Sequence, residues 1–484
     1  MSSIMNEASS SAPSGGLSSF MDRRNFLRTS VLTGSSLYLA TSKTKAQEAA
    51  ATTGKVLKVA LVGAGAQGKR LLESCADIKG IQFVAICDIW DYNRNQSFAR
   101  IKHSYGSCNA YTDIDDMLAK EKDVDCVLIA VPDFLHAPFT RKALQAGKAV
   151  YCEKLMANTV ELAADMVKAQ RETKGMLQIG HQRHSNPRYI NVRDNILYGN
   201  SLLGRVTHCY GQWNRGVSAS VPLTTSKSTE IDPATLAKYG YENMEQFLNW
   251  RSFAKYGGGP IADLGAHQID MFNWFLKANP TSVIATGGVD YYDGKDGRMK
   301  FELPDNVMAI YEYKLPAGTT RAYYQVLTTT GSQGNYEKLM GIDGSVVISE
   351  TPTVNQVYRE PNAPSWIKYS EGDNAVLTRS AVSVYNKFWE KPKPWFREPR
   401  WMDVKVDSRA SKALETYELG VTLARKPHSP HLENFFTCVR DKNPQGLNCP
   451  VEEAYRSAVT VLGVYKSIAS GAKYEFKPEE FTVA

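Results

Sequence analysis

The stretch "GGGPIADLGAHQIDMFNWFL", residues 257–276, places an acid and a histidine four positions apart behind three glycines. Residues with this spacing on a helix project from one face, so Asp263 and His267 can reach the same ligand. Glycines at the helix start let the backbone approach that ligand closely. An imidazole can take a proton from a hydroxyl group and return it near neutral pH. The spacing predicts an acid/base site, and the alternative is a helix that begins with an acid and buries a histidine.

A glycine-rich turn follows an apolar run nearer the start of the chain. In "KVLKVALVGAGAQGKRLLESC", the apolar residues 56–62 precede Gly63, Gly65 and Gly68, and we expect a helix to open near Gln67. The first glycine permits a tight turn, the second lets the backbone approach a pyrophosphate, and the third lets helix and strand pack closely. Free amides at the helix start would hold the phosphates. The pattern predicts that this turn binds a dinucleotide, and the alternative is a tight turn without a nucleotide.

An acid at the end of the next strand indicates which dinucleotide is bound. The run "IQFVAICD" ends in Asp88, twenty residues after Gly68. A carboxylate there accepts hydrogen bonds from the adenosine ribose and repels a 2′-phosphate, so NAD is favoured over NADP. Arg94, a little further on, works against that preference.

Strand-like and helix-like segments then alternate. "DVDCVLIAVP", "AVYCEK" and "MLQIGHQ" read as strands, and residues 135–146 and 159–173 read as helices. This order predicts a doubly wound parallel sheet with a ligand crevice at the carboxyl ends of its strands. Glu153 and Lys154 follow one such strand, so we expect them to face the cofactor.

Composition limits the class of protein. The chain has 484 residues, 43% of them apolar, which is enough for a large core and by length favours two domains. Its formal charge of +7 is spread along the chain, which disfavours nucleic-acid binding. Cys87, Cys126 and Cys152 lie in apolar runs and no CxxC pair occurs, so we expect no disulfide framework and no metal site.

Residues 1–50 are predicted to be an export signal with a disordered lead. Arg23 and Arg24 head "RRNFLRTS", and the apolar run 31–40 that follows is too short to span a bilayer. This pattern resembles a Tat signal, which implies export of the folded protein to the periplasm. No cysteine precedes Cys75, so we expect no membrane anchor. The alternative is a basic disordered tail.

Four motifs together resemble the Gfo/Idh/MocA family, named after glucose-fructose oxidoreductase and inositol dehydrogenase. They are the glycine turn, "VPDFLHAPFTRKALQAGKAVYCEK", "GHQRHSNPRY" and "GGGPIADLGAHQID", in the family's order. The resemblance implies an α/β Rossmann domain over residues 54–180 and an α+β domain with a large, mostly antiparallel open sheet over residues 181–484. In the family the outer face of that sheet often forms an oligomer interface, so a homodimer or homotetramer is expected.

The resemblance also implies roles for single residues. Lys154 would stabilise a developing alkoxide, His267 would be the acid/base, and Asp263 would bind a second hydroxyl and bias the imidazole toward its protonated form. Leu155 stands where the family has a proline that often follows a cis peptide. Asp270 is expected to be a helix-surface acid or one that acts from behind the site. The remaining residues implied by the family are Pro132, His136 and Glu153 near the cofactor and His181 and Arg183 near the substrate.

Resemblance and compartment together predict the activity. The expected protein is an NAD-dependent oxidoreductase acting on a secondary hydroxyl of a sugar or glycoside. Because a periplasm lacks a pool of free NAD, the cofactor would stay bound and be reset within the site. The alternatives are a redox-neutral glycoside hydrolase that uses the same bound NAD, as in glycoside hydrolase family 109, and a non-catalytic module that binds a dinucleotide or sugar.

The resemblance thins over residues 350–427. This insertion mixes Trp389, Trp395 and Trp401 with prolines and basic residues. We expect an arm packed on its own domain or on a neighbouring subunit, and stacking on sugar rings is the alternative.

Overall fold

The computed structural model describes residues 55–218, 221–372, 375–379 and 414–484. The predicted Tat signal and the three tryptophans of the 350–427 insertion lie outside these residues. Within the described chain, no helix is long and apolar enough to cross a membrane, and no group of three His, Cys, Asp or Glu residues is arranged to hold a metal ion.

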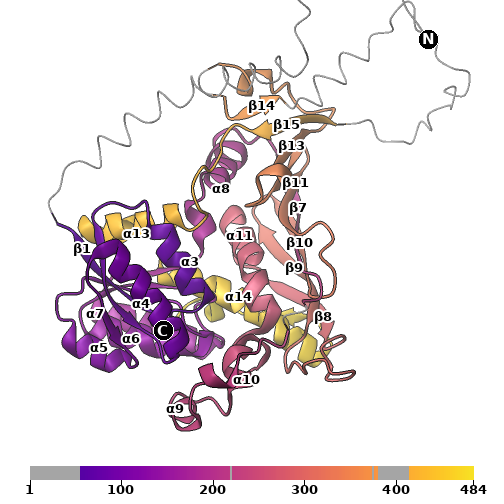
Figure 1. Ribbon diagram of the computed structural model, residues 1–484. Helices are drawn as coiled ribbons and strands as arrows, with labels where there is room; N and C mark the ends of the chain where they lie inside the picture. The colour runs from indigo at the N-terminus through magenta and orange to yellow at the C-terminus, as the bar shows by residue number, and fades with distance from the viewer. Residues whose placement is uncertain (1–54, 219–220, 373–374, 380–413) are drawn as a thin grey trace, which may run out of the picture. The chain divides into compact units, whose positions relative to one another are not determined.

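The first part of the fold is a six-stranded parallel sheet of order β3-β2-β1-β4-β5-β6, flanked by helices (Figure 1). All four residues of β4 are buried, as expected for a parallel strand covered on both faces. The strand order reverses between β1 and β4, which is where ligands bind in such sheets. The predicted Rossmann fold is therefore confirmed. Its strands are β1 (Leu57–Val62), β2 (Ile81–Cys87), β3 (Asn109–Tyr111), β4 (Cys126–Ile129), β5 (Ala149–Cys152) and β6 (Leu177–Ile179), and its helices are α3 (Ala66–Cys75), α4 (Asp91–Tyr105), α5 (Ile114–Lys120), α6 (His136–Gln145) and α7 (Val160–Thr173).

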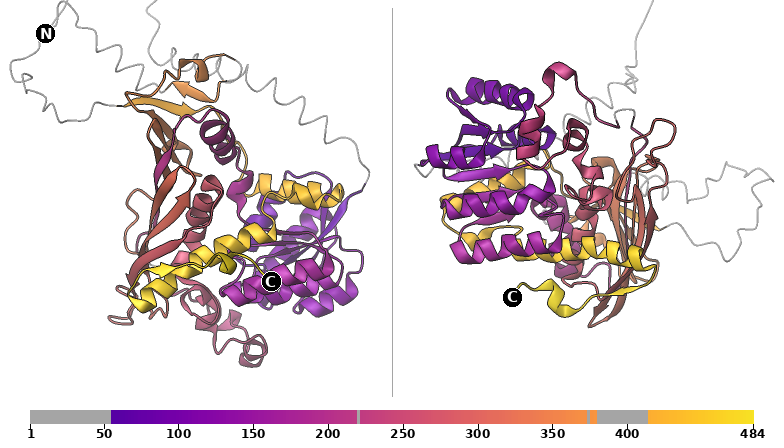
Figure 2. Two further views of the ribbon diagram at one scale, coloured as in Figure 1. Left: turned by 180° about the vertical axis from the view of Figure 1, so that it is seen from behind. Right: turned by 90° about the horizontal axis from the view of Figure 1, so that it is seen from below.

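The second part is a ten-stranded sheet of order β14-β15-β13-β12-β11-β7-β10-β9-β8-β16 (Figures 1 and 2). Of its adjacent strands only β7 and β10 run parallel, so the predicted mostly antiparallel sheet is also confirmed. The strands are β7 (Val206–Asn214), β8 (Ser282–Gly288), β9 (Asn306–Leu315), β10 (Gly318–Leu327), β11 (Asn335–Gly341), β12 (Gly344–Ile348), β13 (Gln356–Arg359), β14 (Leu377–Arg379), β15 (Glu415–Leu419) and β16 (Tyr474–Glu475).

One face of this sheet is covered by helices. Along β9 buried residues alternate with more exposed ones, the pattern of an antiparallel strand with one packed face. Helix α11 packs on β7 and β10, and all of its eleven residues are buried. A π-helical turn, Ile261–Gly265, leads into α11. The helices of this part are α8 (Pro187–Asn191), α9 (Pro233–Lys238), α10 (Met244–Leu248) and α11 (Ala266–Leu276).

The last two helices return to the Rossmann domain. Helix α13 (Ser429–Arg440) packs on α3 (Figure 1). Its side chains Leu432, Phe435 and Phe436 complete the apolar core beneath β1 and β2. Helix α14 (Val451–Ser470) contacts α7 of the Rossmann domain and also β8 and α11 of the second domain.

Candidate active site

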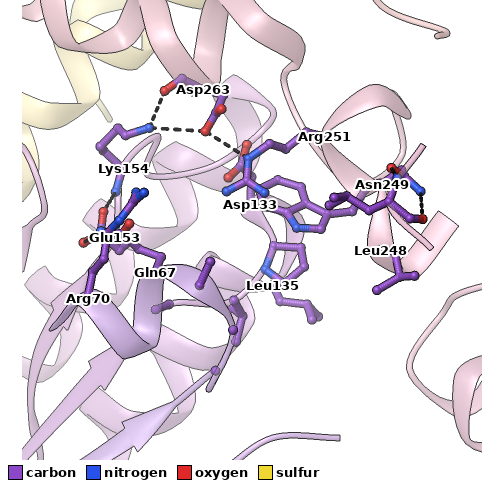
Figure 3. Close-up of a pocket in the computed structure, with 18 of the residues that line it drawn as sticks. Gln67, Arg70, Asp133, Leu135, Glu153, Lys154, Leu248, Asn249, Arg251 and Asp263 are labelled. Carbon is purple, nitrogen blue, oxygen red and sulfur yellow. Dashed lines mark hydrogen bonds and ion pairs between the residues drawn. The ribbon is translucent and has the colours of Figure 1, made fainter. Parts of the chain in front are cut away.

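A cavity of about 890 Å³ lies at the carboxyl ends of the parallel strands, where the second domain faces them. Ligand sites in proteins commonly measure about 300–1,000 Å³. Both domains supply walls: Gly63, Asp88 and Lys154 come from the Rossmann domain, and Asp263 and His267 come from the second. Figure 3 shows Lys154 and Asp263 from the two sides. The residues predicted for a dinucleotide and those predicted for acid/base chemistry therefore share one cavity.

The glycine turn has the geometry that a pyrophosphate requires. Gly63 has a φ of +91°, and a Cβ atom there would lie 2.3 Å from the carbonyl oxygen of Ala130. A Cβ on Gly68 would lie 2.0 Å from the carbonyl oxygen of Gly63, so Gly68 lets α3 pack against the turn. A Cβ on Gly65 would meet no atom within 4 Å, because this glycine borders the open cavity. The turn therefore fits a dinucleotide, whose phosphates would approach the backbone at Gly65.

Asp88 lines the cavity at the end of β2. Its carboxylate accepts hydrogen bonds from the backbone N–H groups of Ala64, at 2.6 Å, and Trp90, at 2.7 Å. Burial raises the pKa of Asp88 despite these bonds. Arg94 donates to the carbonyl oxygen of Asp88 at 2.8 Å and pairs with Asp91, and it is not among the residues that line the cavity. Arg94, which works against the preference for NAD in the sequence, is thus held outside the cavity.

Lys154 and Asp263 both line the cavity and contact each other (Figure 3). The Lys154 ammonium donates to the carbonyl oxygen of Asp263 at 2.5 Å and lies 3.7 Å from its carboxylate. Arg251 lies with its Nε 3.0 Å from the same carboxylate oxygen. Burial would raise the pKa of Asp263, but Arg251 and then Lys154 outweigh it and hold that pKa well below its usual range. The carboxylate stays ionised and cannot serve as a proton donor. The peptide bond between Lys154 and Leu155 is cis.

His267 lines the cavity from the first turn of α11, with its ring centroid 5.5 Å from that of Trp213. Burial, followed by the positive charge of Lys154, lowers its pKa well below the usual value. The expectation that Asp263 biases the imidazole toward its protonated form is wrong, because the Asp263 carboxylate is bound to Arg251 and Lys154. A neutral imidazole is the form that can accept a proton from a hydroxyl group.

The other residues predicted near the cofactor also line the cavity. Gln67 donates to the Glu153 carboxylate at 3.0 Å, and its amide nitrogen lies 3.0 Å from Nε2 of His428. Pro132 and His136 follow β4. The two ring nitrogens of His136 lie 2.9 and 2.8 Å from the carbonyl oxygens of the loops after β5 and β4, and burial lowers its pKa to about 4. His136 therefore lies between two loops of the cofactor site, and as a neutral ring it donates a hydrogen bond to only one of the two carbonyl oxygens.

His181 and Arg183 do not line the cavity, although Gln182 between them does. His181 is buried with Nδ1 3.3 Å from the Asp270 carboxylate. Arg183 forms a buried ion pair with Glu337 and a second, part-buried one with Glu350. Asp270 is not a helix-surface acid but is buried. It accepts hydrogen bonds from Ser457 and lies 2.9 Å from Nε2 of His184.

Several charged residues of the cavity were missed from the sequence, and Asp133 and Arg251 are two of them (Figure 3). Asp133 follows β4, is 5% exposed and accepts a hydrogen bond from the backbone N–H of Gly258 at 3.3 Å. Burial raises its pKa to about 7 against the opposing charge of Lys154. Its position in the loop that follows a buried strand was the available signal. Arg251 carried no signal, because its contact with Asp263 exists only in the folded chain.

Comparison with known proteins gives two family matches. Residues 57–181 match a model described as an oxidoreductase family with an NAD-binding Rossmann fold, and residues 200–346 match one described as the GFO/IDH/MocA C-terminal domain. Inositol 2-dehydrogenase of Rhizobium meliloti is 26% identical over 233 residues, which are 48% of this chain and 59% of that protein. The 2,7-anhydro-N-acetylneuraminate hydratase of Mediterraneibacter gnavus is 24% identical over 268 residues, 54% of this chain and 62% of that protein.

The chain spans about half the length of the curated relatives it matches. Among solved structures, a levoglucosan dehydrogenase in complex with NADH and L-sorbose aligns with a TM-score of 0.61 at 16% identity. The alignment covers 88% of this chain and all of that one. At this identity the likeness establishes the fold.

Proposed function

This chain belongs to the Gfo/Idh/MocA family of NAD-binding oxidoreductases, and from that premise we propose that it moves a hydride between a secondary hydroxyl carbon of a sugar or glycoside and NAD. One observation carries the proposal. Lys154, Asp263 and His267 line the same cavity as the glycine turn and Asp88. The inositol and levoglucosan dehydrogenases among its relatives are named for polyhydroxylated substrates, which supports the substrate class.

Oxidation of a secondary hydroxyl group removes two hydrogens, one from oxygen as a proton and one from carbon as a hydride, and the side chains have separate roles in this step. When bound, the nicotinamide supplies the hydride acceptor. Neutral His267 accepts the hydroxyl proton, and the Lys154 ammonium stabilises the negative charge that develops on the same oxygen. Asp263, ionised and fixed by Arg251, accepts a hydrogen bond from a neighbouring hydroxyl and holds the sugar in register.

The predicted Tat signal adds two features to the proposal. We propose that the protein works in the periplasm with a retained cofactor, which a second sugar or the product resets. A homodimer or homotetramer, assembled through the outer face of the ten-stranded sheet, is part of the same proposal.

Substitution of the two polar groups at the reacting oxygen tests the proposed activity. Lys154→Ala should lower kcat about 10²- to 10³-fold, and His267→Ala about 10²- to 10⁴-fold. Lys120→Ala, which removes an exposed lysine paired with Asp116 on α5, is the matched control and should keep full activity. Turnover is followed by the absorbance of reduced nicotinamide with free sugars as substrates. Folded Lys154→Ala and His267→Ala variants that bind NAD and keep full turnover would refute the assignment.

A redox-neutral glycosidase is the second candidate, and Asp133 favours it. A buried carboxyl with a pKa of about 7 keeps a proton to give to a departing glycosidic oxygen near neutral pH. The hydratase among the relatives also carries a name that is not that of a dehydrogenase. Dialysed protein is incubated with p-nitrophenyl glycosides without added NAD. Phenol release with no net reduced nicotinamide supports the glycosidase, whereas reduction by free sugars without phenol release supports the oxidoreductase.

A further inference from the structure

Residues 221–257, which connect β7 to the π-helical turn before α11, reach back to the Rossmann domain. In the view of Figure 1 their helices α9 and α10 lie just below that domain. The indole N–H of Trp90, after β2, donates to the carbonyl oxygen of Thr229 at 2.6 Å. The Tyr239 hydroxyl donates to the carboxylate of Asp113, after β3, at 3.1 Å, and the Lys238 ammonium lies 3.3 Å from that carboxylate. The segment is therefore attached at the ends of β2 and β3.

Aromatic rings fill the space beneath these polar contacts. The ring of Phe247 meets that of Trp90 edge-on at 5.8 Å and that of Tyr241 at 5.1 Å. Tyr241 also packs on Tyr256 at 4.9 Å and on Phe134, from the loop after β4, at 5.7 Å. The contacts between the segment and the Rossmann domain thus form a packed apolar cluster as well as surface hydrogen bonds.

One polar atom in this cluster has no partner. Tyr241 is 2% exposed and lines the cavity together with Asp88, and its hydroxyl has no hydrogen-bond partner among the described residues. Buried hydroxyl groups are almost always hydrogen-bonded, so an unpaired one beside a cavity indicates a ligand atom. Burial and the Asp88 charge raise the pKa of Tyr241, so its hydroxyl keeps the proton that it would donate.

The position of Asp88 identifies that ligand atom. In Rossmann domains the acid at the end of the second strand binds the adenosine ribose, so this end of the cavity is the adenosine end. We propose that residues 221–257 form the second wall of the adenosine site, that Tyr241 donates a hydrogen bond to the ribose beside Asp88, and that this wall retains the dinucleotide between turnovers. The inference rests on the proposed function, because it supplies the retained cofactor that a self-resetting site requires.

Nucleotide binding tests this wall without any sugar. AMP contains the adenosine ribose but no nicotinamide, and its affinity is measured by calorimetry. Release of NADH into excess NAD is followed by the fluorescence of the bound nucleotide. Tyr241→Phe removes only the hydroxyl group, so we expect AMP to bind about tenfold more weakly and NADH to leave about tenfold faster. The Lys238→Ala/Tyr239→Phe double variant loosens the attachment at Asp113, and NADH should leave severalfold faster.

Lys120→Ala serves again as the control, because it removes a comparable surface ion pair from α5 without touching residues 221–257. Its AMP affinity and NADH release should match those of the natural sequence. Unchanged AMP affinity in Tyr241→Phe, or unchanged release in the double variant, would overturn the inference. If Tyr241→Phe does not fold, the double variant still decides, because Lys238 is exposed and the half-buried Tyr239 loses only its hydroxyl group. If the natural protein turns over sugars but the variants release NADH no faster, the inferred wall is wrong and the proposed activity stands. If the variants release NADH faster but the natural protein turns over no sugar, the proposed activity is wrong and the wall stands.

Discussion

At the scale of single residues, Asp133 is the carboxyl group whose burial has the clearest consequence for stability. Its pKa is about 7 in the folded chain and near 3.9 when unfolded. Between these values the folded state holds a proton that the unfolded state releases, so the free energy of unfolding falls as pH rises from about 4 to about 7. Asp133→Asn removes this effect while its amide oxygen can still accept from Gly258.

We therefore expect Asp133→Asn to gain stability over the natural sequence by on the order of 2 kcal/mol more at pH 7.5 than at pH 5. Urea unfolding of both proteins at the two pH values measures the difference. A stability difference that is the same at both pH values would mean that Asp133 titrates as an ordinary surface acid.

Substitutions at two glycines of the turn should have different effects, one on stability and the other on cofactor binding. Gly68→Ala forces a Cβ against the carbonyl oxygen of Gly63, so we expect a loss of about 1–3 kcal/mol in the free energy of unfolding. Gly65→Ala meets no protein atom, so stability should be preserved, but its methyl group occupies the side of the turn where the phosphates would lie. Thermal unfolding and NAD titration of both variants check the pair. NAD affinity left intact by Gly65→Ala would place the pyrophosphate away from this turn.

At the scale of elements, α13 connects the cavity to the core of the Rossmann domain. Phe435 is fully buried and packs on Tyr151 of β5, while residues 426–428 just before the helix line the cavity. Phe435→Ala should cost about 3–5 kcal/mol in the free energy of unfolding and also weaken NAD binding. Phe435→Leu, which keeps more of the volume, is the milder comparison and should lose less of both. Denaturant unfolding and NAD titration measure the effect, and a loss of stability without weaker NAD binding would separate α13 from the cavity.

The sequence predicted five of the six parallel strands and the ends that carry Asp88 and Lys154, because buried parallel strands are continuous apolar runs and their last residues must face the crevice. It missed β3, whose three residues are not buried. It did not predict Arg251, twelve residues before Asp263 in a segment without a motif. Nor did it predict that His181 and Arg183 turn inward, because their partners Asp270 and Glu337 come from distant elements. The direction of the His267 pKa depended equally on neighbours that only folding brings close.

At the scale of the whole molecule, the cavity wall is assembled from segments far apart in sequence. Residues from the glycine turn, from 221–257 and from 426–428 border the same space. These segments are brought together only when both sheets have folded. Local sequence patterns therefore identified the chemistry of the site but not the shape of the pocket. Under the proposed function, the identity of the substrate is therefore set by the folded cavity and not by any single motif.

The double attachment of α14 has a mechanical consequence. One helix of 20 residues contacts α7 on one side and β8 on the other, so it acts as a strut between the two domains. Bringing the two domains together would shear the packed side chains along that strut, so we expect NAD binding to act on residues 221–257 instead. We expect small-angle X-ray scattering to give the same radius of gyration with and without NAD, and hydrogen exchange to slow on NAD binding mainly within 221–257. A marked decrease in the radius of gyration on NAD binding would show instead that α14 bends. Access to the cavity would then be controlled by movement of the domains and not by residues 221–257.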